Sequence, residues 1–263
     1  MPDGANVGQV PVPWGHLGTW GRFKAEFADF RQFVRHPRLS PRLPRAPGPA
    51  WRGEWLGGLQ VGRLFCWVLL LWAINLTVLG PVAATAASFA GAPRRIPGML
   101  PWFLVVVWAP VIEEMVFRYG LRRPGRALWL APILLVGLFF GRDSMVQLGV
   151  LIAGVGAAVA LSVSGQRWSW SGSRRFSLKF PLVFHGTTLA FAGLHLANFS
   201  LSGAALWFLP LMILPQWVTG LVLGWLRVRF GIGASIMLHA LFNAGPMTLL
   251  WALTRWAPGL LDG

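Results

Sequence analysis

The stretch PWFLVVVWAPVIEEMVFRYGLRR, residues 101–123, places two adjacent glutamates and an arginine at the end of a long apolar run. Charged side chains inside apolar helices are costly and usually mark a functional site. Glu114 and Arg118 are four residues apart, so they share one helix face and can form an ion pair. Glu113 points about 100° away around the helix. We therefore expect Glu113 to face a cavity, where it could act as a general base on water.

The rest of the chain is also apolar. Of 263 residues, 55% are hydrophobic and 12% are charged, about half the charged share of soluble domains. Runs of membrane length predict an all-α, polytopic transmembrane helix bundle. The predicted spans, seven in all, are 64–89, 99–121, 127–141, 145–163, 187–200, 204–227 and 234–255. The transmembrane domain is thus expected to cover residues 61–263.

The basic residues report membrane topology. The chain has 23 Lys and Arg against 8 Asp and Glu, a net charge of +15. Because the arginines punctuate apolar runs, they indicate the positive-inside bias rather than a nucleic-acid partner. Their alternation predicts an N-terminus in the cytoplasm and a C-terminus outside, with the pair Arg94–Arg95 as the one exception. The single cysteine, Cys66, excludes a disulfide framework within the chain.

Residues 1–60 differ from the rest and are predicted to form a cytoplasmic tail rich in proline and arginine. Within them, aromatic residues recur at helical spacing over 19–36, with basic residues between them. We expect a basic amphipathic helix that lies on the inner membrane surface. The alternative is a helix docked on the protein itself. The proline-rich segment 37–49 is expected to be an extended linker.

Two further stretches carry polar side chains in apolar surroundings. In FAGLHLANF, Phe191 and His195 are four residues apart, and in HALFN the same spacing joins His239 to Asn243. An asparagine amide can donate to an oxyanion or hold an imidazole in one tautomer. The alternative for these residues is hydrogen bonding or packing between helices.

The depth of the three stretches supports one common site. Glu113 and His239 fall at similar depths from the inner ends of their predicted spans, at 1.5 Å of rise per residue. His195 matches them if its helix begins near Gly186–Thr188, with a threonine as N-cap. The preceding FSLKFPLVFH, residues 176–185, is then expected to lie at the interface.

Together these stretches resemble the CPBP family of intramembrane proteases, which includes type II CAAX prenyl proteases and Abi proteins. The family is characterised by Glu-Glu-x-x-x-Arg, Phe-x-x-x-His and His-x-x-x-Asn on separate membrane helices. Here they correspond to Glu113-Glu114 with Arg118, Phe191 with His195, and His239 with Asn243. The similarity covers a protease-like core of about 99–255. The long separation of the first two motifs makes residues 126–175 a candidate inserted hairpin.

The resemblance implies hydrolysis of a peptide bond in a membrane-associated substrate, which in one branch of the family is a prenylated CAAX protein. Glu113 would activate water with help from His195, and His239 and Asn243 would stabilise the oxyanion. Glu114, Arg118 and Phe191 would have supporting roles. Two histidines and a glutamate (Glu113, His195, His239) could also bind zinc with an open position. No HExxH motif is present, so a metal-dependent and a glutamate-dependent mechanism both stay open.

Two other functional classes compete with an endopeptidase. A non-catalytic membrane protein, such as an immunity factor or a scaffold for a partner's helix, would need none of the catalytic side chains. A transporter or proton relay could use buried Glu and His, but the sequence has no inverted repeat. The expected partners are the lipid bilayer and a membrane-associated peptide or protein. The expected location is the inner membrane of a bacterium.

Overall fold

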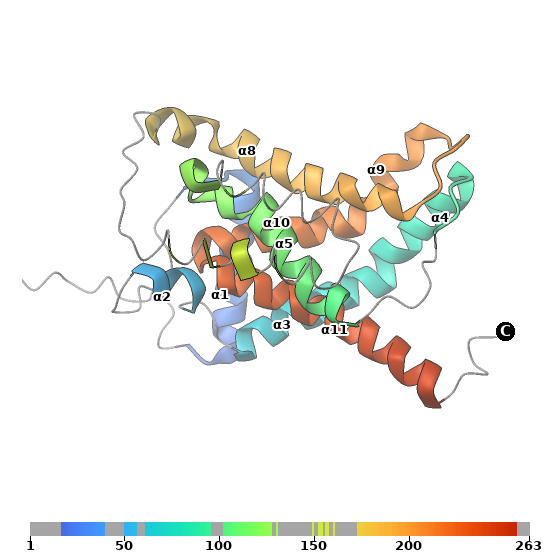
Figure 1. Cartoon of the computed structure of the whole chain (residues 1–263), viewed down its shortest axis with the longest axis horizontal. Helices are drawn as coiled ribbons and strands as arrows, with labels where there is room; N and C mark the ends of the chain where they lie inside the picture. The colour runs from blue at the N-terminus through green and yellow to red at the C-terminus, as the bar shows by residue number, and fades with distance from the viewer. Residues whose placement is uncertain are drawn as a thin grey trace, which may run out of the picture.

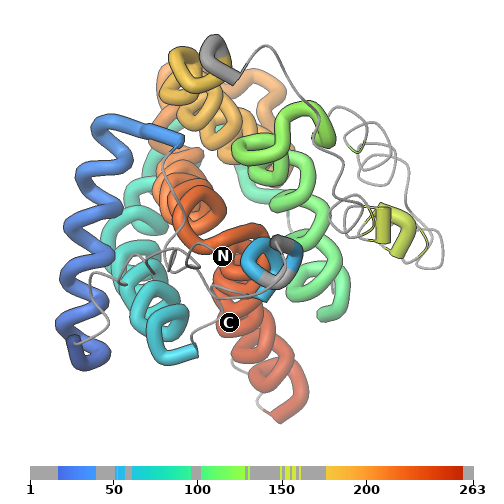
Figure 2. The backbone as a smooth tube through the Cα atoms, turned by 90° about the vertical axis from the view of Figure 1, so that its left-hand side faces the viewer, coloured from blue at the N-terminus to red at the C-terminus, as the bar shows by residue number. Residues whose placement is uncertain are grey.

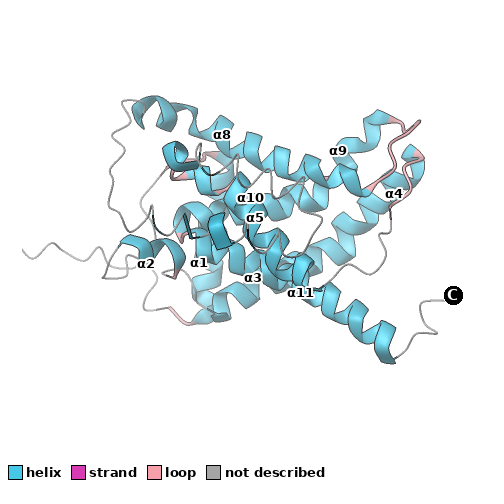
Figure 3. Ribbon diagram, in the orientation of Figure 1, coloured by secondary structure: helices cyan, strands magenta, loops and turns pink. Residues whose placement is uncertain are grey.

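The computed structural model describes residues 17–39, 50–56, 61–95, 102–127 and 173–256, with short pieces at 130, 149, 152–154, 156–157 and 160. Across these residues the chain is helical, apart from one isolated β-bridge between Arg94 and Phe199 (Figure 3). The expected all-α class is confirmed. Most of two predicted spans, 127–141 and 145–163, and most of the hairpin 126–175 lie outside the described residues, as does most of the linker 37–49.

The first long helix runs without interruption from Val61 to Ala90, close to the predicted span 64–89. It comprises α3 (Val61–Ile74), a π-helical turn (Asn75–Leu79) and α4 (Gly80–Ala90). The wide turn ends two residues before Pro81, which has no N–H to donate and would crowd the carbonyl four residues earlier in a regular α-helix. The helix ends at Gly91, whose φ of 66° is the left-handed conformation that glycine favours.

The helix with the two glutamates repeats this design. A π-helical turn (Leu104–Trp108) precedes α5 (Ala109–Phe117), and Pro110 lies in the first turn of α5. The helix ends at Arg118 and continues as a short 3₁₀ turn, Tyr119–Leu121. A π-helical turn shifts side chains around the axis and often occurs at functional sites. Here it lies two turns before Glu113.

The helix with His195 begins earlier than the sequence predicted. Helix α8 runs from Ser173 to Leu194, so the expected start at Gly186–Thr188 and the interfacial segment 176–185 are wrong. Thr187 and Thr188 do not cap a helix but donate back to the carbonyls of Val183 and Phe184. The physical reason is packing, because one face of α8 is buried along its length and overrides the helix-breaking preference of Gly186. That face carries Phe180, Phe184, Thr188 and Phe191.

Three further helices complete the bundle. Helix α9 (Leu209–Met212) and α10 (Leu214–Arg229) are bent by 44° where the sequence predicted one span, and α11 runs from Ile232 to Trp256. In the described part of the chain three helices are long and apolar enough to cross a membrane, or four if the bent pair is one span. These helices make a multi-pass membrane protein. The predicted total of seven spans is not found among the described residues.

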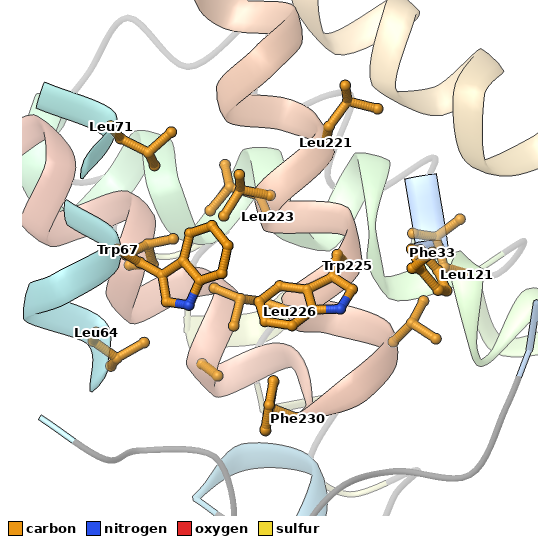
Figure 4. Close-up of a cluster of buried hydrophobic side chains, with 14 of the residues drawn as sticks. Phe33, Leu64, Trp67, Leu71, Leu121, Leu221, Leu223, Trp225, Leu226 and Phe230 are labelled. Carbon is orange, nitrogen blue, oxygen red and sulfur yellow. The ribbon is translucent and has the colours of Figure 1, made fainter. Parts of the chain in front are cut away.

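Helix α10 forms the centre of the bundle. It contacts α8 and α11 along its length and also touches α1 (Thr19–Arg35) and α4, an arrangement that Figures 1 and 2 show from two directions. Trp225 of α10 packs on Trp67 of α3 with ring centroids 5.0 Å apart, and both side chains are fully buried. Figure 4 shows this pair within the apolar cluster. The core therefore fixes α10, which lies beside the candidate site.

Helix α1 docks on the protein rather than presenting its apolar face to lipid. Its position agrees with the predicted helix 19–36. Of the two locations considered for it, the structure shows the second, in which the helix packs on the protein itself. Both acidic residues of α1 face inward. Asp29 accepts hydrogen bonds from Trp225 and Arg229, and Glu26 accepts from Trp67 and lies 3.5 Å from Arg63. Burial raises the pKa of Glu26, against the opposing effect of Arg63.

Asp29 is expected to hold α1 in place. Replacing Asp29 with Ala removes the bidentate pair with Arg229, at 2.6 and 2.8 Å, and the acceptor for Trp225. Hydrogen bonds to charged groups contribute about 1.5–3 kcal/mol each, so Asp29→Ala should weaken docking and accelerate amide hydrogen exchange across residues 19–35. Arg31→Ala, an exposed position on the same helix, is the matched control. Equal exchange in both variants would contradict this role.

Candidate active site

The three sequence motifs meet around His239, which is 3% exposed. Its Nδ1 lies 3.0 Å from Oε1 of Glu114, and its Nε2 lies 3.7 Å from Oε2 of Glu113. The two adjacent glutamates of α5 therefore face the two nitrogens of one imidazole on α11. The sequence predicted that helical geometry would separate their roles, and the structure places the Glu114 carboxylate in the interior and leaves that of Glu113 12% exposed.

Glu114 is the most heavily hydrogen-bonded group of the site. Arg118 donates to its Oε1 at 2.6 Å, which confirms the predicted ion pair, and the Ser235 hydroxyl donates to Oε2. Ser235 also lies 2.9 Å from the Leu223 carbonyl of α10. An ionised carboxylate buried away from water needs several donors to offset its desolvation. Arg118, Ser235 and His239 together provide these donors.

This arrangement fixes the tautomer of His239. Because the Glu114 carboxylate accepts hydrogen bonds, the Nδ1 of His239 must carry a proton and donate it. The other ring nitrogen, Nε2, faces Glu113. At 3.7 Å the Glu113–Nε2 distance is too long for a direct hydrogen bond. It leaves a position between a carboxylate and an imidazole nitrogen at which a water or a reacting atom could bind.

His195 lies beside this pair, at the end of α8, where it begins a 3₁₀ turn (His195–Asn198). Its Nδ1 is 2.9 Å from the Phe191 carbonyl, which can only accept, so Nε2 is left as the acceptor in the neutral ring. Both Glu113 and His239 are close enough to act electrostatically on His195. Despite the early start of α8, the structure therefore brings His195 to the other motifs.

Phe191 fills the space between the charged groups. Its ring centroid lies 4.9 Å from that of His195 and 5.7 Å from that of His239, both in edge-on geometry. The Arg118 guanidinium stacks over the same ring at 3.7 Å. Gly220 of α10 makes room for this stack, because a Cβ there would lie 3.0–3.2 Å from Thr188, Phe191 and Arg118. Phe191 thus keeps the ion pair and both histidines in contact with one aromatic surface.

Asn243 has a definite partner in the π-helical turn before α5. Its side-chain Nδ2 donates to the Val105 carbonyl at 3.0 Å. In this turn the Ala109 N–H bonds to Leu104, so the next donor in the π-helical register would come from residue 110, which is proline and has none. Asn243 satisfies the carbonyl that Pro110 leaves without a donor. The amide has a second N–H, so this bond does not use up its capacity to donate to an oxyanion.

The end of α5 is held from the opposite side by Arg227. Its guanidinium donates to the carbonyls of Arg118 and Tyr119, both at 3.1 Å, and pairs with Glu54 at 2.5 Å. Glu54 belongs to α2 (Ala50–Trp55), which packs against the start of α11. A cation at a helix C-terminus satisfies free carbonyls and complements the helix dipole. This contact fixes where the Glu-Glu-x-x-x-Arg helix ends.

Sequence reasoning missed Ser235 and Arg227. Ser235 lies four residues before His239 in the sequence, so the same helical spacing that joins the other motif residues could have indicated it. In the sequence pattern Arg227 is only one of the basic residues that alternate between the apolar runs. Its role follows from contacts with residues more than 100 positions away, for which the local pattern has no signal.

Glu113, His195 and His239, the residues that could hold a metal, are not gathered as a coordination group. Among the described residues, no group of three or more His, Cys, Asp or Glu side chains is arranged to hold a metal ion. Nδ1 of His239 faces Glu114 and Nδ1 of His195 faces the Phe191 carbonyl, so each ring has only Nε2 to offer a metal. In this arrangement the three side chains do not form a zinc site.

Comparison with known proteins identifies one family. Residues 95–245 match the family described as type II CAAX prenyl endopeptidase Rce1-like. No curated protein and no solved structure matches the chain significantly. The matched region contains all three motifs and the helices that bring them together around His239. The chain therefore belongs to the Rce1-like type II CAAX prenyl endopeptidase family.

Proposed function

We propose that this protein is an intramembrane endopeptidase that hydrolyses a peptide bond of a membrane-associated substrate by glutamate-activated water. Membership of the Rce1-like family supports a protease. The prenylated CAAX-type protein is the substrate class that the family description suggests. The observation that carries the proposal is the Glu113 carboxylate, partly exposed and 3.7 Å from an imidazole nitrogen whose ring is fixed by a second carboxylate.

The proposed reaction uses Glu113 as the proton acceptor. A water held near Glu113 and His195 attacks the carbonyl carbon while one of its protons passes to the Glu113 carboxylate. The carbonyl oxygen becomes an oxyanion, which accepts hydrogen bonds from the Nε2–H of protonated His239 and from the second N–H of Asn243. The C–N bond then breaks, and the proton on Glu113 is transferred to the leaving amine. Atoms and charge balance, and Glu113 returns to its starting state.

Glu113→Gln is expected to remove the proton acceptor while keeping the shape of the side chain. General base catalysis contributes about 10²–10⁴-fold, so kcat should fall by at least that factor. The assay follows cleavage of a farnesylated peptide with a CAAX terminus by the protein in lipid vesicles, and proteome comparison of cells with wild type or Glu113→Gln extends the search for substrates. Cleavage that is unchanged in Glu113→Gln would overturn the role of Glu113 as the proton acceptor, whereas a wild type that cleaves no membrane-associated peptide would favour a non-catalytic scaffold.

The neighbouring glutamate is the matched comparison. Glu114→Gln removes the buried partner of Arg118, and breaking a buried ion pair costs about 3–5 kcal/mol. Glu114→Gln should therefore lower the thermal unfolding midpoint, whereas Glu113→Gln should leave it within a degree or two of wild type. Equal destabilisation by both substitutions would contradict the separation of their roles.

Ser235 is expected to act as a positioning residue through Glu114. In Ser235→Ala the Glu114 carboxylate loses one donor, so its hydrogen bond with Nδ1 of His239 should change. We expect kcat to fall by about 10-fold, equivalent to roughly 1.4 kcal/mol. The diagnostic readout is the ¹⁵N chemical shifts of the His239 ring, which report its tautomer. Thr219→Val removes a buried hydroxyl that bonds only to the Pro215 carbonyl, so it should leave these shifts unchanged. Identical spectra for Ser235→Ala and wild type would refute the role.

A further inference from the structure

A cavity of about 690 Å³ adjoins His195 on the side formed by α4, the segment after it and the start of α10. This volume is within the range that small-molecule and short-peptide ligands occupy. Figure 1 shows α4, α9 and the end of α8 together at one end of the molecule. His195 is the proposed catalytic residue that lines the cavity. A ligand in this space would therefore lie directly beside the reacting groups.

The wall from α4 is made of small residues, including Gly80, Ala83 and Ala87. The polar groups lie on the other sides, where Gln216 of α10 and Asn198 line the cavity beside His195. Among the described residues of the lining, Arg94 is the one with a permanently charged side chain and none is acidic. The electrostatic character of the cavity is thus positive at one point and neutral elsewhere, which suits a ligand with a single negative charge.

Arg94 is held in fixed relation to His195 by its backbone. It forms the β-bridge with Phe199, the Arg95 N–H donates to the Asn198 carbonyl at 2.7 Å, and the Ser200 N–H donates to the Pro93 carbonyl at 2.9 Å. These bonds attach the segment with Arg94 to the turn that begins at His195. In the described part of the chain the exposed guanidinium of Arg94 has no hydrogen-bond or ion-pair partner. A preorganised and unpaired cation is what an anion-binding group requires.

The sequence also singled out this position. Arg94 and Arg95 are the one exception to the alternation of basic loops that predicts the topology. Because these two arginines oppose the positive-inside pattern, membrane orientation does not explain their position in the sequence. The cavity supplies a reason for Arg94, whereas Arg95 does not line it.

We propose that this cavity is a substrate subsite and that Arg94 binds a carboxylate of the peptide beside the scissile bond. The carboxylate comes from an Asp or Glu side chain or from the chain end. The inference rests on the proposed endopeptidase function and assigns a specificity residue to it. A peptide is the favoured occupant because the same cavity is lined by Arg94 and by His195, which the proposed reaction uses. A lipid phosphate has the same charge but would block the path of the substrate.

The test compares Arg94→Gln with Arg95→Gln on two peptides in vesicles of neutral phosphatidylcholine. One farnesylated peptide carries the carboxylate, and the other has every carboxylate near the scissile bond replaced by an amide. Charge-assisted hydrogen bonds are among the stronger polar contacts, so Arg94→Gln should raise KM for the carboxylate peptide about 10-fold and change kcat little. It should leave the amide peptide unaffected, and Arg95→Gln should match wild type on both.

The possible outcomes separate the subsite from the function. Equal effects of Arg94→Gln and Arg95→Gln, or equal effects on both peptides, would overturn the subsite while cleavage still depends on Glu113. An Arg94 effect that arises only in vesicles with anionic lipid would assign the guanidinium to a lipid phosphate and would also overturn it. Absence of cleavage by the wild type would instead overturn the endopeptidase proposal itself, and cleavage by Glu113→Gln at the wild-type rate would overturn its glutamate-activated mechanism.

Discussion

The buried carboxylate of Glu114 is the interaction on which the site depends. It accepts hydrogen bonds from Arg118 of its own helix end and from His239 and Ser235 of α11, and Ser235 also reaches α10 through the Leu223 carbonyl. A carboxylate with no exposure to water is stable only while its donors stay in place. The position of α5 against α10 and α11 is therefore coupled to the charge of one side chain. The orientation of His239, and so the approach of Glu113, follows from it.

A second constraint comes from proline. Pro110 has no backbone N–H, so in the π-helical turn before it the Val105 carbonyl has no backbone donor. The side chain of Asn243 on α11 donates to this carbonyl instead. Asn243 of the third motif is thus hydrogen-bonded to the helical segment that carries the first motif, at a carbonyl that the proline leaves free. Together with the Glu114–His239 bond, this contact holds α5 and α11 at two points, one on each side of Glu113.

The sequence predicted the parts of this structure that depend on one helix face. The Glu114–Arg118 pair, the limits of α11 and the closeness of Glu113 to His239 follow from spacing and from apolar runs. His195 joins them although its helix begins earlier than the predicted depth required. The start of α8, the docking of α1 and the role of Arg227 do not, because they depend on packing and ion pairs between distant segments. Asp29 and Arg229 are 200 residues apart. The local pattern shows that α1 is amphipathic. It does not show whether the apolar face of α1 packs on protein or on lipid.

The docking of α1 also restricts how the chain can be threaded through the bilayer. Through Glu26 and Asp29, this one helix contacts Arg63 at the start of the first long helix and Arg229 at the end of α10. The start of the first long helix and the end of α10 are therefore held against the same short helix. Any threading of the chain through the bilayer has to bring these two ends together at α1, a requirement that hydrophobicity alone does not set.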